Sequence, residues 1–450
     1  MRSTLLWVIL LIGASLAWAG RAESAEDATG GTRDGTRAGQ QKPLAFLTAT
    51  AVDGKVRLTC FKSTPFFEAT RQHAPDSVKL RIWRRDLPEF RFGRDYGEYF
   101  DGLSRHDARV VFEGTISAVN NRKYEFLDES VRCGQTYAYW VGVDGDGLPT
   151  GPVAVKVRDP RVWWSGEETQ RRLETLAAQF SGVVESREVG QTVHGRRLRA
   201  LLAGRRDRML VLIGSLHAGE SGPELIVPAF ETVVRDHPDL LKRAGLAILP
   251  RVNSDERERM VRGYPPYVRT NSNGVDLNRN FAADWETIDS SYGLITTDPD
   301  GMTYRGPSPA SEPETLAVVR LFQGLKPAAV LSYHHLASIT GSAFLYPKLA
   351  AKDSAYAARC TELNRVYRAA ISPPDIETTP TVARAGTTGG SLPAWVYAQF
   401  GVPAMDVEGD RSPWCVKATL DTATWEDVQE AQQRHTRAVV AVLSALAAAP

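Results

Sequence analysis

The sequence predicts two folded parts, an N-terminal all-β sandwich and a C-terminal α/β domain with a central mixed sheet flanked by helices. Between about residues 43 and 160, apolar residues alternate with polar ones in short runs separated by turn residues, as in half-buried strands. Within residues 161–450, helical stretches alternate with short apolar runs, which is typical of α/β domains. A chain of 450 residues also exceeds the length that one hydrophobic core usually serves.

Residues 1–19 have the features of a secretory signal peptide. Arg2 precedes the apolar run 5–16, and Ala17-Trp18-Ala19 forms a small-x-small cleavage site. The run is too short to cross a bilayer comfortably, so we expect a secreted or periplasmic protein with no membrane span after cleavage. Residues 20–42, rich in Gly, Ala, Thr and charge, predict a disordered linker.

The charge balance argues against nucleic acid as the main partner. The chain has 54 basic and 53 acidic residues and a net charge of +1. None of its four cysteines is in a C-x-x-C pair, so disulfides or structural thiols are expected rather than a metal or redox site. Cys360 with Cys415, and Cys60 with Cys133, are the pairs that each half allows, but the sequence leaves the pairing open.

The first folded part, residues 43–160, resembles a fibronectin type III domain. The segment from Cys133 through Tyr137 to Val143, followed by a glycine-rich turn and a last valine-rich strand, is similar to the closing hairpin of such domains, and Tyr137 falls where they carry a corner tyrosine. The aromatic and charged stretch 90–106 departs from the pattern, and we interpret it as an ordered excursion rather than a binding loop.

The α/β part contains four expected helices and six expected strands. The helices are 168–180, 224–236, 312–323 and 425–446, and the strands are 198–202, 209–213, 246–250, 328–332, 342–346 and 403–407. Ser311 and Glu314 have the spacing of a capping box for the third helix, with Pro313 in its first turn.

Polar residues follow several of these strands directly. They are 215–220, 253–255, 333–335 and Glu408. In open α/β sheets, ligands bind beyond the carboxyl ends of the strands, so we expect the functional site there.

His217 and Glu220 after strand 209–213 are the first candidate metal ligands. If the chain turns helical there, this i, i+3 pair lies on one face, and an imidazole and a carboxylate can converge on zinc. A catalytic zinc site needs a third protein ligand. His334 and His335 both follow strand 328–332, and the chemistry alone leaves the choice between them open.

The segment from Arg269 to Phe281 contains two arginines and four asparagines. Because a planar guanidinium grips a carboxylate bidentately and a neighbouring amide can fix its orientation, this segment predicts an anion-binding pocket.

Several motifs together resemble the zinc metallocarboxypeptidases of the pancreatic carboxypeptidase A type. They are Gly190-Gln-Thr-Val-His-Gly-Arg, His217-Ala-Gly-Glu220, Gly274-Val-Asp-Leu-Asn-Arg-Asn-Phe281, the segment from Tyr304 to Thr315, and Leu331-Ser-Tyr-His334. The resemblance spans about residues 162–447. It implies one zinc ion per chain, held by His217, Glu220 and His334.

The resemblance also implies roles for four further residues. Asn278 and Arg279 match the pair that holds the terminal carboxylate of the substrate, and Arg269 resembles the arginine that polarises the scissile carbonyl. Glu408 is similar to the general base, which takes a proton from water and passes it to the leaving amine. Arg279 would make the enzyme an exopeptidase, since a desolvated arginine without a carboxylate disfavours mid-chain peptides.

The sequence departs from the digestive members of this family at Ala385, at Gly219 and at Pro393-Ala-Trp395, where they have an acidic-aromatic pattern. Ala385 stands where they carry a mobile tyrosine, and Gly219 replaces the arginine within their His-x-x-Glu. Leu392 falls near the residue that sets side-chain preference, and as an apolar residue it argues against a strongly charged terminal side chain.

Three functions remain open. The first is a secreted metallocarboxypeptidase acting on peptide or protein C-termini. The second is an amidase or carboxypeptidase acting on diaminopimelate-containing cell-wall peptides, with Arg384 as an extra charge contact. The third is a peptide-binding protein on the same scaffold without catalysis, which the retention of all three ligands and Glu408 argues against.

Overall fold

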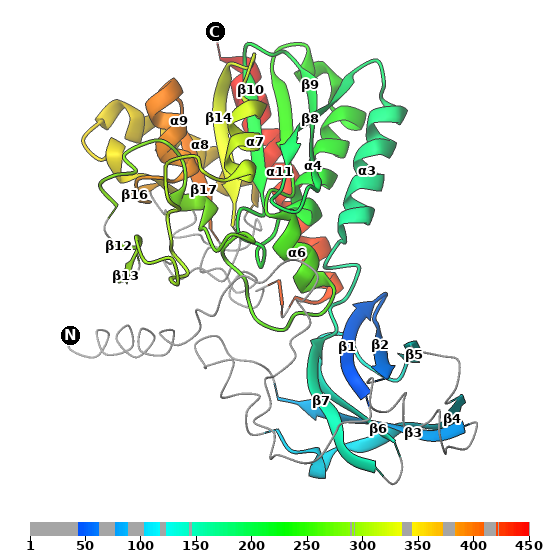
Figure 1. Cartoon of the computed structure of the whole chain (residues 1–450). Coiled ribbons are helices and arrows are strands. Elements are labelled where there is room, and N and C mark those ends of the chain that lie inside the picture. The colour runs from blue at the N-terminus through cyan, green and yellow to red at the C-terminus, as the bar shows by residue number, and fades with distance from the viewer. Residues whose placement is uncertain are drawn as a thin grey trace, which may run out of the picture. The chain divides into compact units, whose positions relative to one another are not determined.

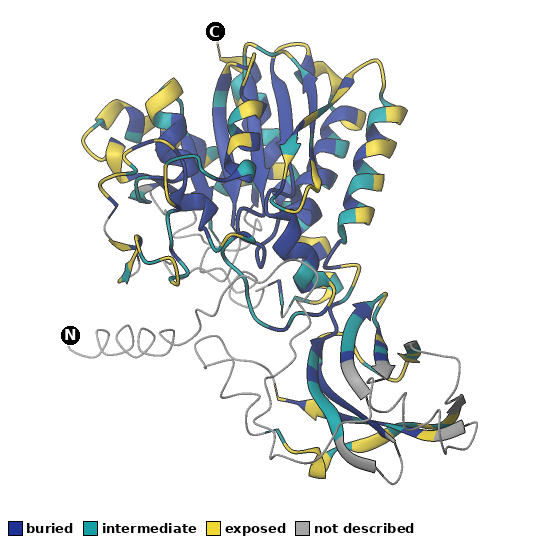
Figure 2. Ribbon diagram, viewed as in Figure 1, coloured by how far each residue is buried: buried dark blue, intermediate teal, exposed yellow. Residues whose placement is uncertain are grey.

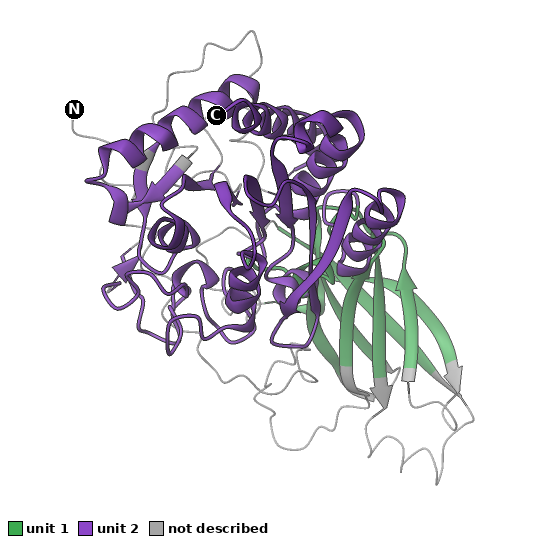
Figure 3. Ribbon diagram, turned by 90° about the horizontal axis from the view of Figure 1, so that it is seen from above, with its two compact units in different colours: residues 1–160, 259–267 green, residues 161–258, 268–450 purple. Residues whose placement is uncertain are grey.

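The computed structural model divides the chain into two compact units, residues 1–160 with 259–267 and residues 161–258 with 268–450 (Figure 3). The described residues are 44–62, 77–88, 103–117, 123–143, 146–288, 290–291, 293–334, 344–371, 383–408, 420–421 and 423–449. The expected signal peptide 1–19, the expected linker 20–42 and most of the stretch 90–106 lie outside them, as do His335 and Cys415.

The first unit contains two antiparallel sheets. One has the order β1 (Leu44–Val52), β2 (Lys55–Lys62), β5 (Lys123–Asp128), and the other has the order β4 (Arg109–Ser117), β3 (Ser77–Leu87), β6 (Thr136–Val143), β7 (Asp146–Lys156). Alternate residues of both sheets form one core, for example Val56 and Leu58 from β2 with Tyr139 and Val141 from β6. An all-β N-terminal region is therefore confirmed.

The predicted corner tyrosine makes a local hydrogen bond. The Tyr137 hydroxyl accepts from the Arg132 backbone N–H at 2.8 Å, and the Tyr137 side chain is buried. This bond ties the start of β6 to the chain that precedes it, as in a tyrosine corner. The assignment to the fibronectin type III class stays a prediction.

Residues 259–267 cluster with the first unit although their neighbours in sequence belong to the second. Ala51 N–H donates to Arg262 C=O and Lys156 N–H donates to Gly263 C=O, both at 2.8 Å. Nothing in the sequence pattern marks this excursion, because the hydrogen bonds are between backbone groups far apart in the chain.

The second unit is built on an eight-stranded mixed sheet flanked by helices, as predicted (Figure 1). Its strand order is β16 (Arg384–Thr387), β15 (Phe344–Pro347), β17 (Ala404–Val407), β14 (Pro327–Tyr333), β10 (Met209–Gly214), β11 (Gly245–Leu249), β9 (Arg197–Gly204), β8 (Val184–Gln191). The four central strands β17, β14, β10 and β11 are mutually parallel, so their carboxyl ends share one edge.

Helices pack on both faces of this sheet. One face of the sheet is covered by four helices: α3 (Gly166–Gln179), α4 (Pro223–Asp236), α8 (Ser354–Ile371) and α11 (Trp425–Ala448). The opposite face is covered by α7 (Pro313–Leu321) and α9 (Leu392–Phe400). The short α5 (Pro238–Leu241) follows α4, and α6 (Ser254–Val261) follows β11. In the described part of the chain, no helix combines the length and apolarity that a bilayer span requires.

Strand β10 shows why the centre of the sheet is fixed by its sequence. Leu210 and Leu212 point into the core shared with α4 and α11, whereas Met209, Val211 and Ile213 point into the core shared with α7 and α9. All six residues of β10 are buried (Figure 2). A run that is apolar on both faces is what a central parallel strand requires.

The expected capping box of α7 does not form. The N-cap is Glu312 rather than Ser311, and Glu312 makes no side-chain cap. The Glu314 carboxylate instead accepts from Val193 N–H and Asn271 Nδ2, both at 3.0 Å, so tertiary partners replace the local one. Pro313 does begin the helix, as predicted.

The cysteines behave as structural thiols where the structure describes them. Cys60 and Cys360 are buried free thiols, and burial raises the pKa of each, to about 12 and about 11. The Cys60–Cys133 disulfide allowed by the sequence is therefore not formed. The partner of the other allowed pair, Cys415, lies outside the described residues.

Candidate active site

The loop between β10 and α4 carries the first two candidate ligands on a turn. Glu220 N–H donates to His217 C=O at 3.2 Å, and helix α4 begins only at Pro223, so the two side chains converge through a turn and not along a helical face. Gly214 makes this turn possible, because a Cβ there would lie 2.6 Å from Gly222 Cα and 2.8 Å from the Pro250 carbonyl oxygen.

Buried polar groups hold this loop from outside. Arg257 Nη1 donates to the backbone carbonyls of Ala218 and Glu220, and Arg257 Nη2 pairs with the Glu224 carboxylate. Both Arg257 and Glu224 are fully buried. A buried guanidinium requires acceptors of this kind, and although Arg257 Nε has no hydrogen-bond partner, its two terminal nitrogens fix the loop.

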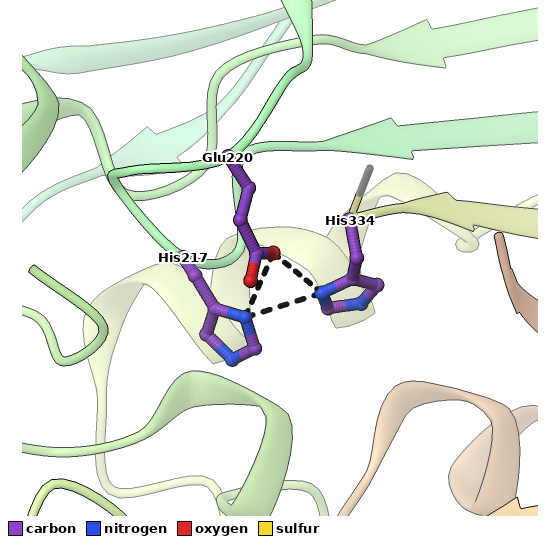
Figure 4. A group of neighbouring side chains, drawn as sticks. All are labelled: His217, Glu220 and His334. Atoms are coloured by element: carbon purple, nitrogen blue, oxygen red, sulfur yellow. Dashed lines mark hydrogen bonds and ion pairs between the residues drawn. The ribbon is translucent and has the colours of Figure 1, made fainter. Parts of the chain in front are cut away.

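His334 follows β14 and brings the third candidate ligand to the same point. Its Nδ1 lies 2.7 Å from Glu220 Oε2 and 3.1 Å from His217 Nδ1, and His217 Nδ1 lies 2.9 Å from Glu220 Oε2 (Figure 4). All three side chains are buried. β10 and β14 are parallel neighbours, which places the ends of both strands together.

The outer nitrogens of the two imidazoles face carboxylates. His217 Nε2 lies 3.0 Å from Asp276 Oδ1, and His334 Nε2 lies 3.3 Å from Asp406 Oδ1. An N–H on each Nε2 would leave both Nδ1 lone pairs directed at the Glu220 carboxylate. A proton on one Nδ1 would satisfy part of this group, whereas a metal cation between the three atoms would satisfy all of them at once.

Asp276 is a site residue that the sequence reasoning missed. Its Oδ1 accepts from the Asn278 N–H at 3.0 Å and contacts His217, while its Oδ2 accepts from Arg269 Nε at 2.8 Å. Burial opposes ionisation, but Arg269 and Arg279 hold the pKa of Asp276 well below its usual range. The sequence Gly-Val-Asp before Asn278 and Arg279 could have indicated Asp276. An aspartate that caps the turn containing these two residues lies close to both of them.

One cavity of about 250 Å³ joins most of the candidate residues. It is lined by His217, Arg269, Asn278, Arg279, His334 and Glu408, together with other residues that include Asp406, Lys348 and Thr387. The structure thus brings seven of the eight predicted site residues to one place, counting Glu220 through its contacts with both histidines. These residues come from loops after β10, β14 and β17 and from the 269–281 segment.

Glu408 lies directly after β17 and lines this cavity. Burial is the main cause that raises its pKa, from 4.5 to about 7; the carboxylates of Glu220 and Asp406 add to the rise, and His334 opposes it. A carboxylate with a pKa near the working pH can both take up and release a proton, which is what a general base in hydrolysis requires.

Hydrogen bonds hold the side chains of both Arg279 and Asn278 in the cavity wall. Arg279 donates through Nε and Nη2 to Ser291 Oγ, at 3.1 and 2.8 Å, which orients the guanidinium in the cavity wall. Asn278 donates through Nδ2 to Asp406 Oδ2 at 3.0 Å and accepts through Oδ1 from Leu392 N–H at 2.9 Å. Asn278 therefore links the cavity wall to α9.

Leu392 does not lie where the sequence placed it. Its side chain is fully buried in the core under α9, and it is not among the residues that line the cavity. A proline at the first turn of α9 and the Ser391 cap begin the helix at Leu392 and direct its side chain to the sheet. The expectation that Leu392 contacts the substrate side chain is therefore wrong for this structure.

Strand β16 and the residue after it present small side chains to the cavity. Gly386, Thr387 and Thr388 line the cavity, whereas Ala385, which the sequence analysis aligned with the tyrosine of the digestive enzymes, packs against the core. The Arg384 side chain lies outside the described atoms. The sequence reasoning missed Thr387, Thr388 and Lys348, which reach the cavity only through the tertiary fold.

A family model described as zinc carboxypeptidase matches residues 169–429, more than half of the chain. The chain belongs to the zinc carboxypeptidase family. The matched region contains the three candidate ligands, Arg269, Asn278, Arg279 and Glu408.

Relatives in this family match the chain over limited lengths. Murein peptide amidase A of Escherichia coli K12 is 43% identical over 70 residues, 15% of this chain and 29% of that protein. Human carboxypeptidase A6 is 29% identical over 206 residues, 41% of this chain and 45% of that protein. The chain thus spans less than half the length of these curated relatives.

Solved structures of zinc carboxypeptidases share the fold. Carboxypeptidase A from Helicoverpa armigera has a TM-score of 0.52 at 17% identity, covering 83% of this chain and 98% of that one. Bovine thrombin-activatable fibrinolysis inhibitor has a TM-score of 0.50 at 20% identity, covering 63% of this chain and 97% of that one. At these identities the likeness shows the fold alone.

The donor set fits the zinc of this zinc carboxypeptidase family. Three atoms each about 2.1 Å from one tetrahedral ion would lie about 3.4 Å apart, close to the separations observed between the His217, Glu220 and His334 donors. Two imidazole nitrogens with one carboxylate oxygen is a known catalytic zinc set, which keeps a fourth position open. Zinc is therefore the cofactor, and the His-Glu-His group is its site.

Proposed function

We propose that this chain is a secreted zinc-dependent metallocarboxypeptidase that hydrolyses the C-terminal peptide bond of peptides or proteins. One observation carries the proposal: His217 and His334, which both contact Glu220, border one cavity together with the raised-pKa carboxylate of Glu408 and the Arg279 guanidinium. Metal, base and carboxylate receptor within one cavity of about 250 Å³ suit removal of a single terminal residue.

Arg279 and Ser291 set the register of the bound peptide. Arg279 is buried, and its carboxylate neighbour Asp276 lies 4.0 Å away and already accepts from Arg269. A terminal carboxylate would give the guanidinium a direct, charge-assisted contact that a mid-chain peptide does not offer, and this favours chain ends.

Glu408 and Arg269 serve the reacting bond. When bound, zinc activates water and polarises a carbonyl oxygen. Glu408 accepts the proton of the attacking water and delivers it to the leaving nitrogen. Arg269, held through Nε by Asp276, lines the cavity and stabilises the oxygen where charge develops; removal of such a donor typically costs about 3 kcal/mol of barrier.

The test compares the full chain with Glu408→Gln. Wild type, with one zinc per chain, should release free amino acids from the carboxyl ends of a mixed peptide library, and Glu408→Gln should retain zinc and lose release by at least about 100-fold. C-terminally amidated copies of the same peptides serve as the substrate control and should resist. Zinc binding with no release from any peptide would contradict the proposal and favour a peptide-binding protein.

A second candidate function is hydrolysis of diaminopimelate-containing cell-wall peptides. Two observations favour it: the 43% identity with murein peptide amidase A over 70 residues, and the cavity-lining Lys348, which adds a cation to Arg269 and Arg279. Cell-wall peptides carry carboxylates beyond the terminal one, which an additional lysine would attract.

Matched tripeptides that differ only in diaminopimelate or alanine at the last position distinguish the two functions. If cell-wall peptides are the substrate, the diaminopimelate peptide should have the higher kcat/KM by at least about tenfold, and Lys348→Met should remove most of that preference. Equal rates for both peptides, unchanged in Lys348→Met, would leave the general carboxypeptidase as the function.

We also propose export as the location, from residues 1–19. Expression of the full chain and of a copy without residues 1–19, each probed in cytoplasmic, periplasmic and medium fractions, checks this. Recovery of the full chain in the cytoplasm at its original mass would contradict it.

A further inference from the structure

Asp406 occupies a buried position between two parts of the active site. It lies on β17 two residues before Glu408, so strand alternation turns both side chains to the same side of the sheet. Its side chain is nearly buried and lines the cavity. A buried carboxylate there needs polar partners, and the partners that it has are informative.

The two carboxylate oxygens of Asp406 contact different functional groups. Oδ1 lies 3.3 Å from His334 Nε2, and Oδ2 accepts from Asn278 Nδ2 at 3.0 Å. His334 is a zinc ligand, and Asn278 lines the substrate cavity beside Arg279. Asp406 therefore joins the metal half of the site to the substrate half.

The contact with His334 resembles that of the other histidine ligand but is looser: His217 Nε2 and Asp276 Oδ1 are hydrogen-bonded at 3.0 Å, whereas His334 Nε2 and Asp406 Oδ1 form an ion pair at 3.3 Å in which Oδ1 makes no hydrogen bond. His217 presents Nδ1 to the metal position and Nε2 to Asp276, and His334 presents Nδ1 to the metal position and Nε2 to Asp406. A carboxylate behind a ligating imidazole fixes the tautomer and ring orientation and increases the basicity of the inner nitrogen.

We propose that Asp406 is a positioning residue that orients His334 for zinc and, through Asn278, holds the wall of the substrate cavity. It does not touch the reacting bond in this assignment. The substrate part rests on the proposed carboxypeptidase function, whereas the zinc part does not.

Ser332 is the competing partner of His334. Its Oγ lies 3.0 Å from His334 Nε2, so a hydroxyl could supply the acceptor that we assign to Asp406. The two differ in charge: a carboxylate attracts the Nε2–H as an anion, and bonds to charged groups contribute about twice as much as neutral ones. Removal of Asp406 should therefore weaken zinc binding more than removal of Ser332.

The experiment measures zinc affinity of full-length Asp406→Asn, Ser332→Ala and wild type by competition with a chelating dye at pH 7. Asp406→Asn should raise the zinc dissociation constant by about 10- to 100-fold, and Ser332→Ala by less. Asp276→Asn, which removes the equivalent carboxylate behind His217, should resemble Asp406→Asn. Asp255→Asn removes a buried carboxylate that binds Thr192 and His194, and should leave zinc affinity unchanged.

Two further readouts separate positioning from general destabilisation. The thermal midpoint of each metal-free variant shows whether it is folded, and Asp406→Thr, whose β-branched side chain suits a strand, substitutes if the asparagine variant is not. With cobalt in place of zinc, Asp406→Asn should change the visible absorption spectrum. On a cleaved peptide at saturating zinc, it should raise KM by severalfold more than it lowers kcat.

Zinc affinity of folded Asp406→Asn within about threefold of wild type would overturn the proposal, as would an equal or larger effect of Ser332→Ala. These zinc measurements need no substrate. A protein that binds zinc in the predicted order but cleaves no peptide would refute the carboxypeptidase function and leave the assignment of Asp406 standing.

Discussion

At the scale of single residues, the raised pKa of Glu408 favours proton transfer near neutral pH but lowers the stability of the folded protein. Burial raises its pKa to about 7, so the carboxylate is a proton acceptor near neutrality, yet holding it ionised in the fold costs free energy. The same environment therefore costs the protein stability as the pH rises from about 4.5 through about 7.

Glu408→Gln should stabilise the metal-free protein at high pH. An acid whose pKa rises on folding contributes stability that is present below its unfolded pKa of 4.5 and is lost as pH rises through about 7. The variant should therefore match wild type near pH 4.5 and exceed it at pH 8 by roughly 1 to 3 kcal/mol. Denaturant unfolding at the two pH values measures this, and a variant less stable than wild type at pH 8 would contradict it.

Arg279→Met should act on recognition of the chain end. Loss of a charge-assisted contact with the terminal carboxylate should reduce kcat/KM by roughly 10- to 100-fold for peptides with a free carboxyl end. Amidated peptides lack that partner, so their low rates should change little. The ratio of the two rates, measured on one peptide pair, should collapse in the variant, and an unchanged ratio would show that another cation reads the chain end.

At the scale of elements, the close approach of the β10–α4 loop to its own strand decides where the ligands lie. The backbones of Gly214 and Gly222 approach so closely that a side chain on Gly214 would clash with Gly222. The turn formed by the hydrogen bond from Glu220 N–H to His217 C=O lies between these two glycines in the sequence. The ligand geometry therefore depends on residues that never touch the metal.

Gly214→Ala should displace this loop. The new Cβ would lie 2.6 Å from Gly222 Cα and 2.7 Å from Ile226 Cδ1, so backbone must shift, at a cost of about 1 to 3 kcal/mol of stability together with weaker zinc binding. Gly182→Ala is the matched control, because a Cβ there meets nothing within 4 Å. Thermal unfolding and dye competition test both; equal zinc affinity in the two variants would be evidence against the close-approach argument.

At the scale of the whole molecule, the two units are not two continuous stretches of chain. Residues 259–267 leave the second unit and make backbone hydrogen bonds with residues of β1 and β7, and Val268 and Arg269 follow immediately. Hydrogen bonds with β1 and β7 thus hold a segment that leads directly to Arg269, which lines the cavity.

A fragment beginning at residue 161 should be less stable than the full chain. Without residues 1–160, backbone groups of Arg262 and Gly263 lose their partners Ala51 and Lys156 in the segment that immediately precedes Arg269. We expect a lower thermal midpoint and a lower kcat/KM for the fragment at equal zinc occupancy. A fragment equal to the full chain in both would show that the sandwich has no such role.

Zinc removal should lower the thermal midpoint of the full chain. Binding of the ion to the folded site alone adds about 2.7 kcal/mol at a free zinc concentration 100 times the dissociation constant. His334→Ala should abolish most of this difference, whereas His194→Ala, at an exposed histidine outside the cavity, should retain it. Scanning calorimetry with and without chelator measures the difference.

The sequence by itself determined the features that depend on local pattern and on ligand chemistry. Short apolar runs predicted β10 and β14, and the helical stretches between such runs predicted α3, α4 and α11 to within a few residues. The motif around His217 and Glu220 indicated zinc because few residue types bind it. These features can be predicted from the sequence because they depend only on residues adjacent in the chain and on the chemistry of single side chains.

Only the tertiary structure decided which residues meet. Strands β8 and β16 and helices α6, α8 and α9 lacked a pattern strong enough to predict them, and Leu392 proved to be a core residue because the start of α9 turned it inward. Asp276 and Asp406 are site residues because they contact histidines 59 and 72 positions away in the chain. Glu314 accepts a hydrogen bond from Asn271 instead of forming the expected capping box. Contacts between segments distant in the chain depend on strand order and loop path, which local sequence does not encode.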